Sequence, residues 1–361
     1  MKTYRLIHIL AAAALCASLT MVSTRPCRGQ TKLGSPDVIN TGSVIGYVAF
    51  SPNGQYLALT GQVEKIIHGA VRLYAVGSWN EISSPSIESA AEEYDALGPD
   101  GWSSDSLRLF TTGDARRTDG NNGALVGYFP QGRLPRLERE WEFPWSIQEV
   151  SLISDLPYGN EFALYDSSVE LVDFSTGRIV RQYGSLGGST VNAPICIYDN
   201  KLLVGLAGFG LAITDVRTCR ILGRRRLPFG GHHCALSSDR SKAVVEFRPA
   251  KNSGCSCQVF SASDLTPIGK RMDFDPFFRV DRLVFSHDGS EVFALLEQDY
   301  QINGNWDANT ILVTGNVRTG IVTPLYRPIA SYPDDMAISN DGRYLACSTW
   351  DGLYVWDLTK K

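Results

Sequence analysis

The feature that most constrains the fold of this chain is a unit of short alternating segments and tight turns at its C-terminal end. Residues 336–358 read MAISNDGRYLACSTWDGLYVWDL. Residues alternate in a period of two on either side of two glycine-containing turns, and this pattern predicts three strands. The Asp341-Gly342 pair favours a tight turn, because glycine takes a positive φ at little steric cost. Strands of about five residues are not stable alone, so the unit must pack against neighbours.

Weaker copies of this unit recur back to residue 47. The positions that open the first turn of each copy are Ser51, Ser103, Ser154, Tyr198, Ser237, Ser286 and Ser339. Their spacing runs from 39 to 53 residues and averages 48. A blade of a β-propeller takes about 40–50 residues. The repeat therefore predicts an all-β chain: a seven-bladed β-propeller of four-stranded antiparallel blades. One domain would span residues 36–358, followed by a short tail at 359–361.

The last copy is one strand short, because the sequence ends at Lys361. The segment 36–41 (PDVINT), ahead of the first copy, is an unassigned short strand. We expect this N-terminal segment to pair with residues 353–356, complete the last blade and close the ring. Closure of this kind would hide two exposed sheet edges.

Three of the turn and strand sequences carry a resemblance to a known family. These are FSPNG at 50–54, FSHDG at 285–289 and LYVWDL at 353–358. Together they resemble the WD-repeat (WD40-like) β-propeller family over residues 36–358. Only the last copy keeps the family's Trp-Asp pair, at Trp356 and Asp357, and the Gly-His pair before the first strand is mostly missing. The chain therefore resembles a degenerate, extracytoplasmic member of the family.

The N-terminus has the pattern of a secretory signal peptide. Lys2 and Arg5 precede an apolar run at 6–19, with small residues near a cleavage site after Ala17 or Ser23. We assign 1–23 to the signal and 24–35 to a linker. The apolar run is shorter than the roughly 20 residues that a membrane span needs. The sequence thus predicts a secreted or periplasmic protein with no membrane span in the mature chain.

The connections between strands differ in length, and the long ones indicate a binding face. The turns after the first strand of each copy are short, whereas 62–69, 113–123, 248–254, 297–309, 83–93, 184–189 and 273–281 are long connections. Long loops on a rigid scaffold commonly carry binding residues. The candidate binding residues on this long-loop face are Trp145, Phe229, His232, His233, Phe277, Phe278, Trp306 and Tyr332. Aromatic packing between blades is the alternative for each aromatic residue.

Two groups of residues raise the question of a metal, and neither has the spacing of a recognised site. One is His232, His233 and Cys234 with Cys255 and Cys257. Its spacing matches no common zinc pattern, and a disulfide or buried thiols explain the cysteines more simply. The other is Asp114, Asp119, Asn121 and Asn122. It lacks the alternating aspartates and terminal glutamate of a calcium loop. We therefore expect no metal and no cofactor.

Charge and motifs narrow the function class. The formal net charge is −4, with no concentrated basic face of the kind that binds nucleic acid. None of the common catalytic motifs is present, including GxSxG, HExxH and the P-loop. We expect a non-catalytic scaffold that binds a protein or peptide on its long-loop face. The alternatives are a propeller enzyme of the lactonase or quinoprotein-dehydrogenase kind, and a component of an envelope complex.

Overall fold

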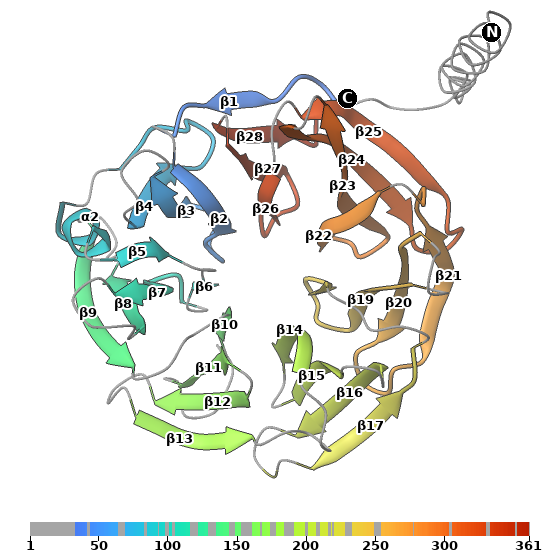
Figure 1. The fold of residues 1–361 in the computed structure, drawn as a ribbon, viewed down its shortest axis with the longest axis horizontal. Helices are drawn as coiled ribbons and strands as arrows, with labels where there is room; N and C mark the ends of the chain where they lie inside the picture. The colour runs from blue at the N-terminus through green and yellow to red at the C-terminus, as the bar shows by residue number, and fades with distance from the viewer. Residues whose placement is uncertain are drawn as a thin grey trace, which may run out of the picture. The chain divides into compact units, whose positions relative to one another are not determined.

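The structure is a computed structural model, and the residues that it describes lie within Lys32–Lys361. They are 33–41, 44–63, 69–82, 85–92, 94–97, 101–102, 105–115, 122–128, 135–143, 149–152, 161–166, 168–173, 178–183, 191–198, 201–206, 210–215, 218, 220–227, 233–248, 254–276, 278–302, 305–329, 333–350 and 352–360. The strands among them form seven small antiparallel sheets (Figure 1). We number these sheets 1 to 7 in chain order.

Sheets 1 to 3 follow the first three copies of the repeat. Sheet 1 contains β2 (Val44–Phe50), β3 (Tyr56–Val63) and β4 (Gly69–Ala75). Sheet 2 contains β5 (Tyr94–Leu97), β6 (Gly101–Trp102), β7 (Arg108–Ala115), β8 (Asn122–Tyr128) and β9 (Arg136–Phe143). Sheet 3 contains β10 (Glu149–Leu152), β11 (Glu161–Asp166), β12 (Ser168–Asp173) and β13 (Arg178–Tyr183). The first strand expected in the second copy is split, because β5 and β6 both pair with β7.

Sheets 4 to 6 each have the four strands that the repeat predicts. Sheet 4 contains β14 (Val191–Tyr198), β15 (Lys201–Leu206), β16 (Gly210–Asp215) and β17 (Ile221–Arg225). Sheet 5 contains β18 (Cys234–Leu236), β19 (Lys242–Phe247), β20 (Ser256–Ser261) and β21 (Pro267–Asp273). Sheet 6 contains β22 (Arg279–Phe285), β23 (Glu291–Ile302), β24 (Asn305–Asn316) and β25 (Val322–Ile329).

Sheet 7 joins the two ends of the described chain. It contains β26 (Pro333–Ile338), β27 (Tyr344–Thr349), β28 (Gly352–Asp357) and β1 (Asp37–Ile39). The β1 strand pairs with β28 in antiparallel register, with Val38 opposite Tyr354 (Figure 1). This is the pairing that the sequence predicts for 36–41.

Sheet 1 departs from the expected four strands. Its strand order is β2-β3-β4, and only an isolated bridge from Tyr74 to Glu81 continues it. Helix α2 (Pro85–Ala91) follows, within 83–93, which the sequence indicated was a long connection. Ile87, Ala90 and Ala91 recur at helical spacing and are buried, so the period of 3.6 explains why this segment packs as a helix. The prediction of four strands in this copy is therefore wrong for the described residues.

The long connection expected at 297–309 is also different. The strands β23 and β24 continue past the expected ends as one hairpin, paired from Glu291 with Asn316 to Ile302 with Asn305. Only 303–304 separate the two strands. Cross-strand pairing satisfies the backbone groups of this polar segment, which the sequence pattern alone did not reveal.

The apolar core lies between neighbouring sheets. In β19 the side chains of Ala243, Val245 and Phe247 pack into a cluster with residues of sheet 4. Val244, on the other face of the same strand, packs into a cluster with residues of sheet 6. Successive side chains of a strand point to opposite faces, so the apolar run buries both faces of this strand. Similar clusters lie between sheets 1 and 2, 6 and 7, and 7 and 1.

The first strands of the sheets also contact one another in succession. The pairs in contact are β2 with β6, β6 with β10, β10 with β14, β14 with β18, β18 with β22, β22 with β26, and β26 with β2. Among the residues that the structure describes, no helix has the length and apolar character of a membrane span.

Candidate functional site

A group of charged side chains lies where β22 and β26 begin, on the side of the sheets from which the long connections leave. Because successive strands are antiparallel, the turn after the first strand and the connection into it lie at opposite ends. The group is Arg279, Asp281, Arg282, Glu297, Asp334 and Asp335. We call the three aspartates with Arg282 the carboxylate cluster.

Arg282 connects three sheets through this cluster. Its Nε donates to Oδ1 of Asp335 at 2.9 Å, so β22 is tied to β26. The other oxygen of Asp335, Oδ2, accepts the backbone N–H of Val48 in β2 at 3.0 Å. The guanidinium carbon of Arg282 lies 5.7 Å from the ring centre of Tyr47, also in β2. A cation over an aromatic face is attracted by the ring quadrupole, so one side chain links sheets 6, 7 and 1.

The other two carboxyl groups of the cluster are less well compensated. Burial raises the pKa of Asp281 to about 6, although Arg282 acts in the opposite direction. Burial, together with the charge of Asp281, raises the pKa of Asp334 to about 7. The Oδ2 atom of Asp334 is buried without a hydrogen-bond partner. Burial opposes the charge of Arg282 too, but Asp335 and Asp281 outweigh it and raise the pKa of the guanidinium.

A neighbouring ion pair occupies the second arginine. Arg279 and Glu297 lie opposite each other in the register of β22 and β23. Nη2 of Arg279 contacts Oε2 of Glu297 at 2.6 Å, and Nε donates to the same oxygen at 3.0 Å. Glu297 is only 2% exposed. Arg282 is thus the guanidinium that faces the three aspartates directly.

An exposed tryptophan lies beside the cluster. Trp350, in the turn between β27 and β28, is 46% exposed, and its side chain hydrogen-bonds to Asp334. On the same sheet, burial and the nearby carboxylates raise the pKa of Cys347 well above its usual value. Because the thiolate is the nucleophilic form, this thiol is not an activated nucleophile.

The structure describes three of the eight candidate binding residues, and it does not gather them at the carboxylate cluster. Phe278 is partly buried and packs against the apolar cluster between sheets 5 and 6. His233 is half-buried, and its carbonyl accepts the N–H of Glu246. Trp306 lies in β24 opposite Gln301, in a strand where a loop was expected. The others, Trp145, Phe229, His232, Phe277 and Tyr332, lie outside the described residues.

The cysteines of sheet 5 are separated by a strand. In the strand order β18-β19-β20, β19 lies between Cys234 and Cys257. Cys255 and Cys257 are buried free thiols, and burial raises the pKa of both. No group of three or more metal-binding side chains occurs within the described parts of the chain. Of the proposed calcium ligands, Asp119 and Asn121 lie outside those parts, while Asp114 and Asn122 pair across β7 and β8.

The turns at the other end of the strands are tied to one another. The side chain of Asn340 donates to the carbonyl of Pro52 at 2.9 Å, joining sheets 7 and 1. The N–H of Asn53 donates to Ser106 Oγ at 2.8 Å, and Lys242 Nζ donates to the carbonyl of Gly289 at 3.0 Å. This end of the sheets is therefore braced by contacts between short turns.

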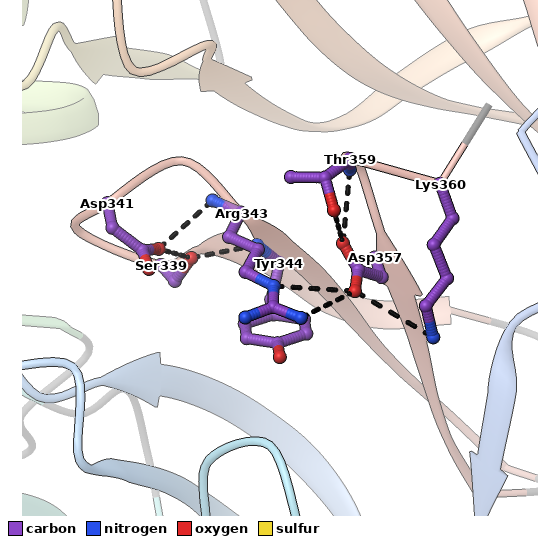
Figure 2. Close-up of polar contacts among 7 residues, drawn as sticks. All are labelled: Ser339, Asp341, Arg343, Tyr344, Asp357, Thr359 and Lys360. Carbon is purple, nitrogen blue, oxygen red and sulfur yellow. Dashed lines mark hydrogen bonds and ion pairs between the residues drawn. The ribbon is translucent and has the colours of Figure 1, made fainter.

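The aspartate of the Trp-Asp pair in the last copy lies at this same end of the strands, and its contacts are within sheet 7. Figure 2 shows Asp357 between Arg343 and Thr359, with Ser339 and Asp341 in the adjoining turn. Arg343 Nη2 contacts Asp357 Oδ2 at 3.1 Å, and Thr359 Oγ1 donates to Oδ1 at 2.6 Å. These hydrogen bonds, from Thr359 first and then Arg343, lower the pKa of Asp357 to about 2. The aspartate holds the end of β28 in place.

Sequence reasoning missed the carboxylate cluster. Its signal was present in the paired Asp334-Asp335 just before one predicted strand and in Asp281-Arg282 just before another. Charged residues on the first strand of a unit are expensive to bury unless they meet partners. Their partners come from other sheets, about 50 residues away in the case of Arg282 and Asp335, so no local pattern pairs them.

Comparison with known proteins identifies the fold and nothing narrower. Among solved structures, 1275 chains match this one. One is the crystal structure of the β-propeller domain of Cps50 (Swd1) from Myceliophteria thermophila, with a TM-score of 0.69 and 15% identity. The match covers 90% of this chain and 100% of that chain. No family model and no curated protein matches the sequence.

The chain therefore has the fold of a β-propeller, built from small antiparallel sheets. A fold shared by so many chains hosts many functions, so the function has to be argued from the site.

Proposed function

We propose that this protein is a non-catalytic scaffold that binds a protein or peptide on its long-loop face. The observation that carries the proposal is the exposed Trp350 beside the carboxylate cluster. Tryptophan is enriched among the residues that dominate protein–protein binding energy. The opposite end of the sheets is occupied by contacts between short turns, which favours the long-loop face. Propellers of the WD40 kind commonly bind proteins, and this agrees with the proposal.

Cross-linking in the native host, followed by mass spectrometry, tests the binding face. We expect a partner to be recovered with the wild-type protein and lost with Trp350→Ala. Ile321→Ala is the matched control. Ile321 is also a large exposed hydrophobic residue, at 63%, but it lies at the turn between β24 and β25, at the end of the strands away from the long-loop face. Retention of the partner by Trp350→Ala would show that the wrong face was chosen. If the wild-type protein enriches no partner, the scaffold hypothesis is wrong.

The ring proposed for this scaffold has seven blades and is closed by β1. The succession of contacts between first strands, from β2 through β6 and on to β26, supports a closed order, and the pairing of β1 with β28 supplies the closing strand. Removing residues 33–41 exposes the edge of β28 and removes Ile39 from the apolar cluster between sheets 7 and 1. We expect a lower melting temperature or loss of soluble protein. An unchanged melting temperature would contradict closure by β1.

Export is proposed on the N-terminal pattern at 1–23, which lies outside the described residues. N-terminal sequencing of the mature protein, with fractionation of the host cells, tests it. Recovery of an uncleaved chain in the cytoplasm would overturn the assignment.

An enzyme of the lactonase or quinoprotein-dehydrogenase kind and an envelope-complex component remain the alternatives. Metal analysis and an absorbance spectrum address the first, since a stoichiometric metal or bound chromophore would favour it. Co-fractionation with envelope proteins addresses the second.

A further inference from the structure

The carboxylate cluster carries more negative charge than the side chains around it compensate. Arg282 is the guanidinium that acts on Asp281, Asp334 and Asp335, while Arg279 acts more weakly and on Asp281. The other arginine, Arg279, is engaged by Glu297 at 2.6 Å. Like charges that share a partly buried site disfavour full ionisation, because the surroundings screen them less than water does.

The hydrogen bonds of the cluster are also unevenly shared. Asp335 takes the Nε–H of Arg282 on one oxygen and the N–H of Val48 on the other. Asp334, next to it in β26, has a buried Oδ2 with no hydrogen-bond partner. A buried carboxylate oxygen without a donor is costly, and protonation removes that cost. Asp334 is therefore the member of the cluster best placed to hold a proton.

The cluster occupies a junction between sheets. The strands β22 and β26 contact each other, and β26 contacts β2. The polar link across this junction runs through Arg282, Asp335 and Val48. Trp350 connects it to the solvent-exposed face through its hydrogen bond to Asp334. A change of charge at Asp334 acts on both the sheet junction and the exposed indole.

We propose that Asp281 and Asp334 make the junction between sheets 6 and 7 a pH-sensitive switch. With a proton on Asp334, repulsion among the carboxyls is low and the junction is compact. When both carboxyls lose their protons, three carboxylates surround Arg282 and the contact of β26 with β22 weakens, while the indole of Trp350 binds the ionised Asp334 more strongly. The switch is independent of the identity of any partner. The groups that face these two carboxyls are Arg279 and Arg282 of β22, Glu297 of β23, Asp335 of β26 and Trp350 of the β27–β28 turn.

The direction of the pH effect follows from linkage. The pKa of Asp281 is raised from 3.8 to about 6 and that of Asp334 to about 7. A raised folded-state pKa means that the folded protein binds the proton more tightly than the unfolded chain. The stabilisation is complete below about pH 4, and it is lost as the pH rises through the folded-state pKa values.

Asp239 and Asp288 in the short turns have their pKa lowered to about 2 by hydrogen bonds from serine. Their stabilising effect is lost only as the pH falls below about 4.

The test is the melting temperature of the full chain at about pH 5 and about pH 8 at constant ionic strength. We expect the wild-type protein to melt at least about 2 °C lower at the higher pH. Asp334→Asn keeps the shape of the side chain without the charge. It should flatten this dependence and melt above the wild type near pH 8. Glu92→Gln is the matched control, because Glu92 is an exposed carboxylate after α2, and it should keep the wild-type dependence.

Two measurements on the intact protein keep the proposal testable if a variant fails to fold. Carbon NMR of aspartate carboxyls follows the titration of Asp281 and Asp334 directly. Acrylamide quenching of tryptophan fluorescence, with Trp350→Phe as the blank, follows the exposure of Trp350. We expect two titrations well above the usual aspartate range, and no stronger quenching of Trp350 at high pH, because ionised Asp334 holds the indole more strongly. Titration of both groups near their usual value of about 4 would overturn the proposal. So would equal pH dependence of stability in the wild type and Asp334→Asn.

Discussion

Replacing Arg282 with methionine should destabilise the protein far more than the same change at Arg343. Both arginines are paired with an aspartate, at 2.9 Å to Asp335 and 3.1 Å to Asp357. The Arg282 side chain is 28% exposed and that of Asp335 17%; the Arg343 side chain is 49% exposed and that of Asp357 6%, so the two arginines differ in their access to water. Methionine retains much of the aliphatic volume of arginine, so the two substitutions compare the loss of a charge in two environments.

The expected magnitudes follow from burial. Removing one partner of a buried ion pair costs about 3–5 kcal/mol, because the other charge is left uncompensated. Since Arg282 keeps some contact with water, we expect the lower end, about 3 kcal/mol. Pairs that involve an exposed charge contribute little, because water screens them, so we expect a much smaller loss for Arg343→Met. Urea denaturation of both variants near neutral pH measures the two free energies of unfolding.

The pH dependence of the loss makes the reasoning more specific. Near pH 5 the carboxyls of Asp281 and Asp334 bind protons in the folded state, since their pKa values are raised to about 6 and about 7. Arg282 then compensates fewer negative charges, so the cost of Arg282→Met should shrink at acidic pH. The reasoning is refuted if both variants lose less than about 1 kcal/mol. It is also refuted if the loss for Arg282→Met is the same at both pH values.

Two further substitutions test contacts between sheets. Gly342→Ala should destabilise the protein more than Gly54→Ala in urea denaturation. Both glycines have positive φ, 71° and 69°, but only at Gly342 would a new Cβ meet the side chain of His287. Equal losses in the free energy of unfolding would mean that the His287 side chain moves aside at little cost. Trp102→Phe should cost about 1 kcal/mol or more, because it removes the hydrogen bond from the indole to the carbonyl of Ala49 at 3.1 Å. An unchanged melting temperature would show that this bond between sheets 2 and 1 contributes nothing.

The sequence predicted the strands well where turn chemistry and alternation agree. The turn of residues 339–342 lies between β26 and β27 as expected, and Gly342 takes the positive φ that an Asp-Gly turn requires. The pairing of 36–41 with the last copy was also predicted, because the last copy lacks one strand and 36–41 is a strand that no copy uses. Helix α2 was missed, since a seven-residue segment with three small or apolar residues on one face is a weak signal outside its packing environment.

The candidate site was predicted less well. The sequence indicated the long-loop face, and the carboxylate cluster with Trp350 lies at that end of the strands. It also named aromatic residues as candidate anchors, with packing between blades as the alternative, and Phe278 is partly buried against the apolar cluster between sheets 5 and 6. Whether an aromatic side chain near a strand end turns inward or outward depends on the neighbouring sheet. The local sequence does not specify which residues the neighbouring sheet places there.

The sequence by itself determined a repeat of short antiparallel strands and a spare strand for the last unit. It did so because strand alternation and glycine turns are local properties of neighbouring residues. Only the tertiary structure decided which charges meet. Arg282 and Asp335 are brought together by the packing of sheet 6 on sheet 7, and their interaction depends on distance and burial, which no one-dimensional pattern specifies.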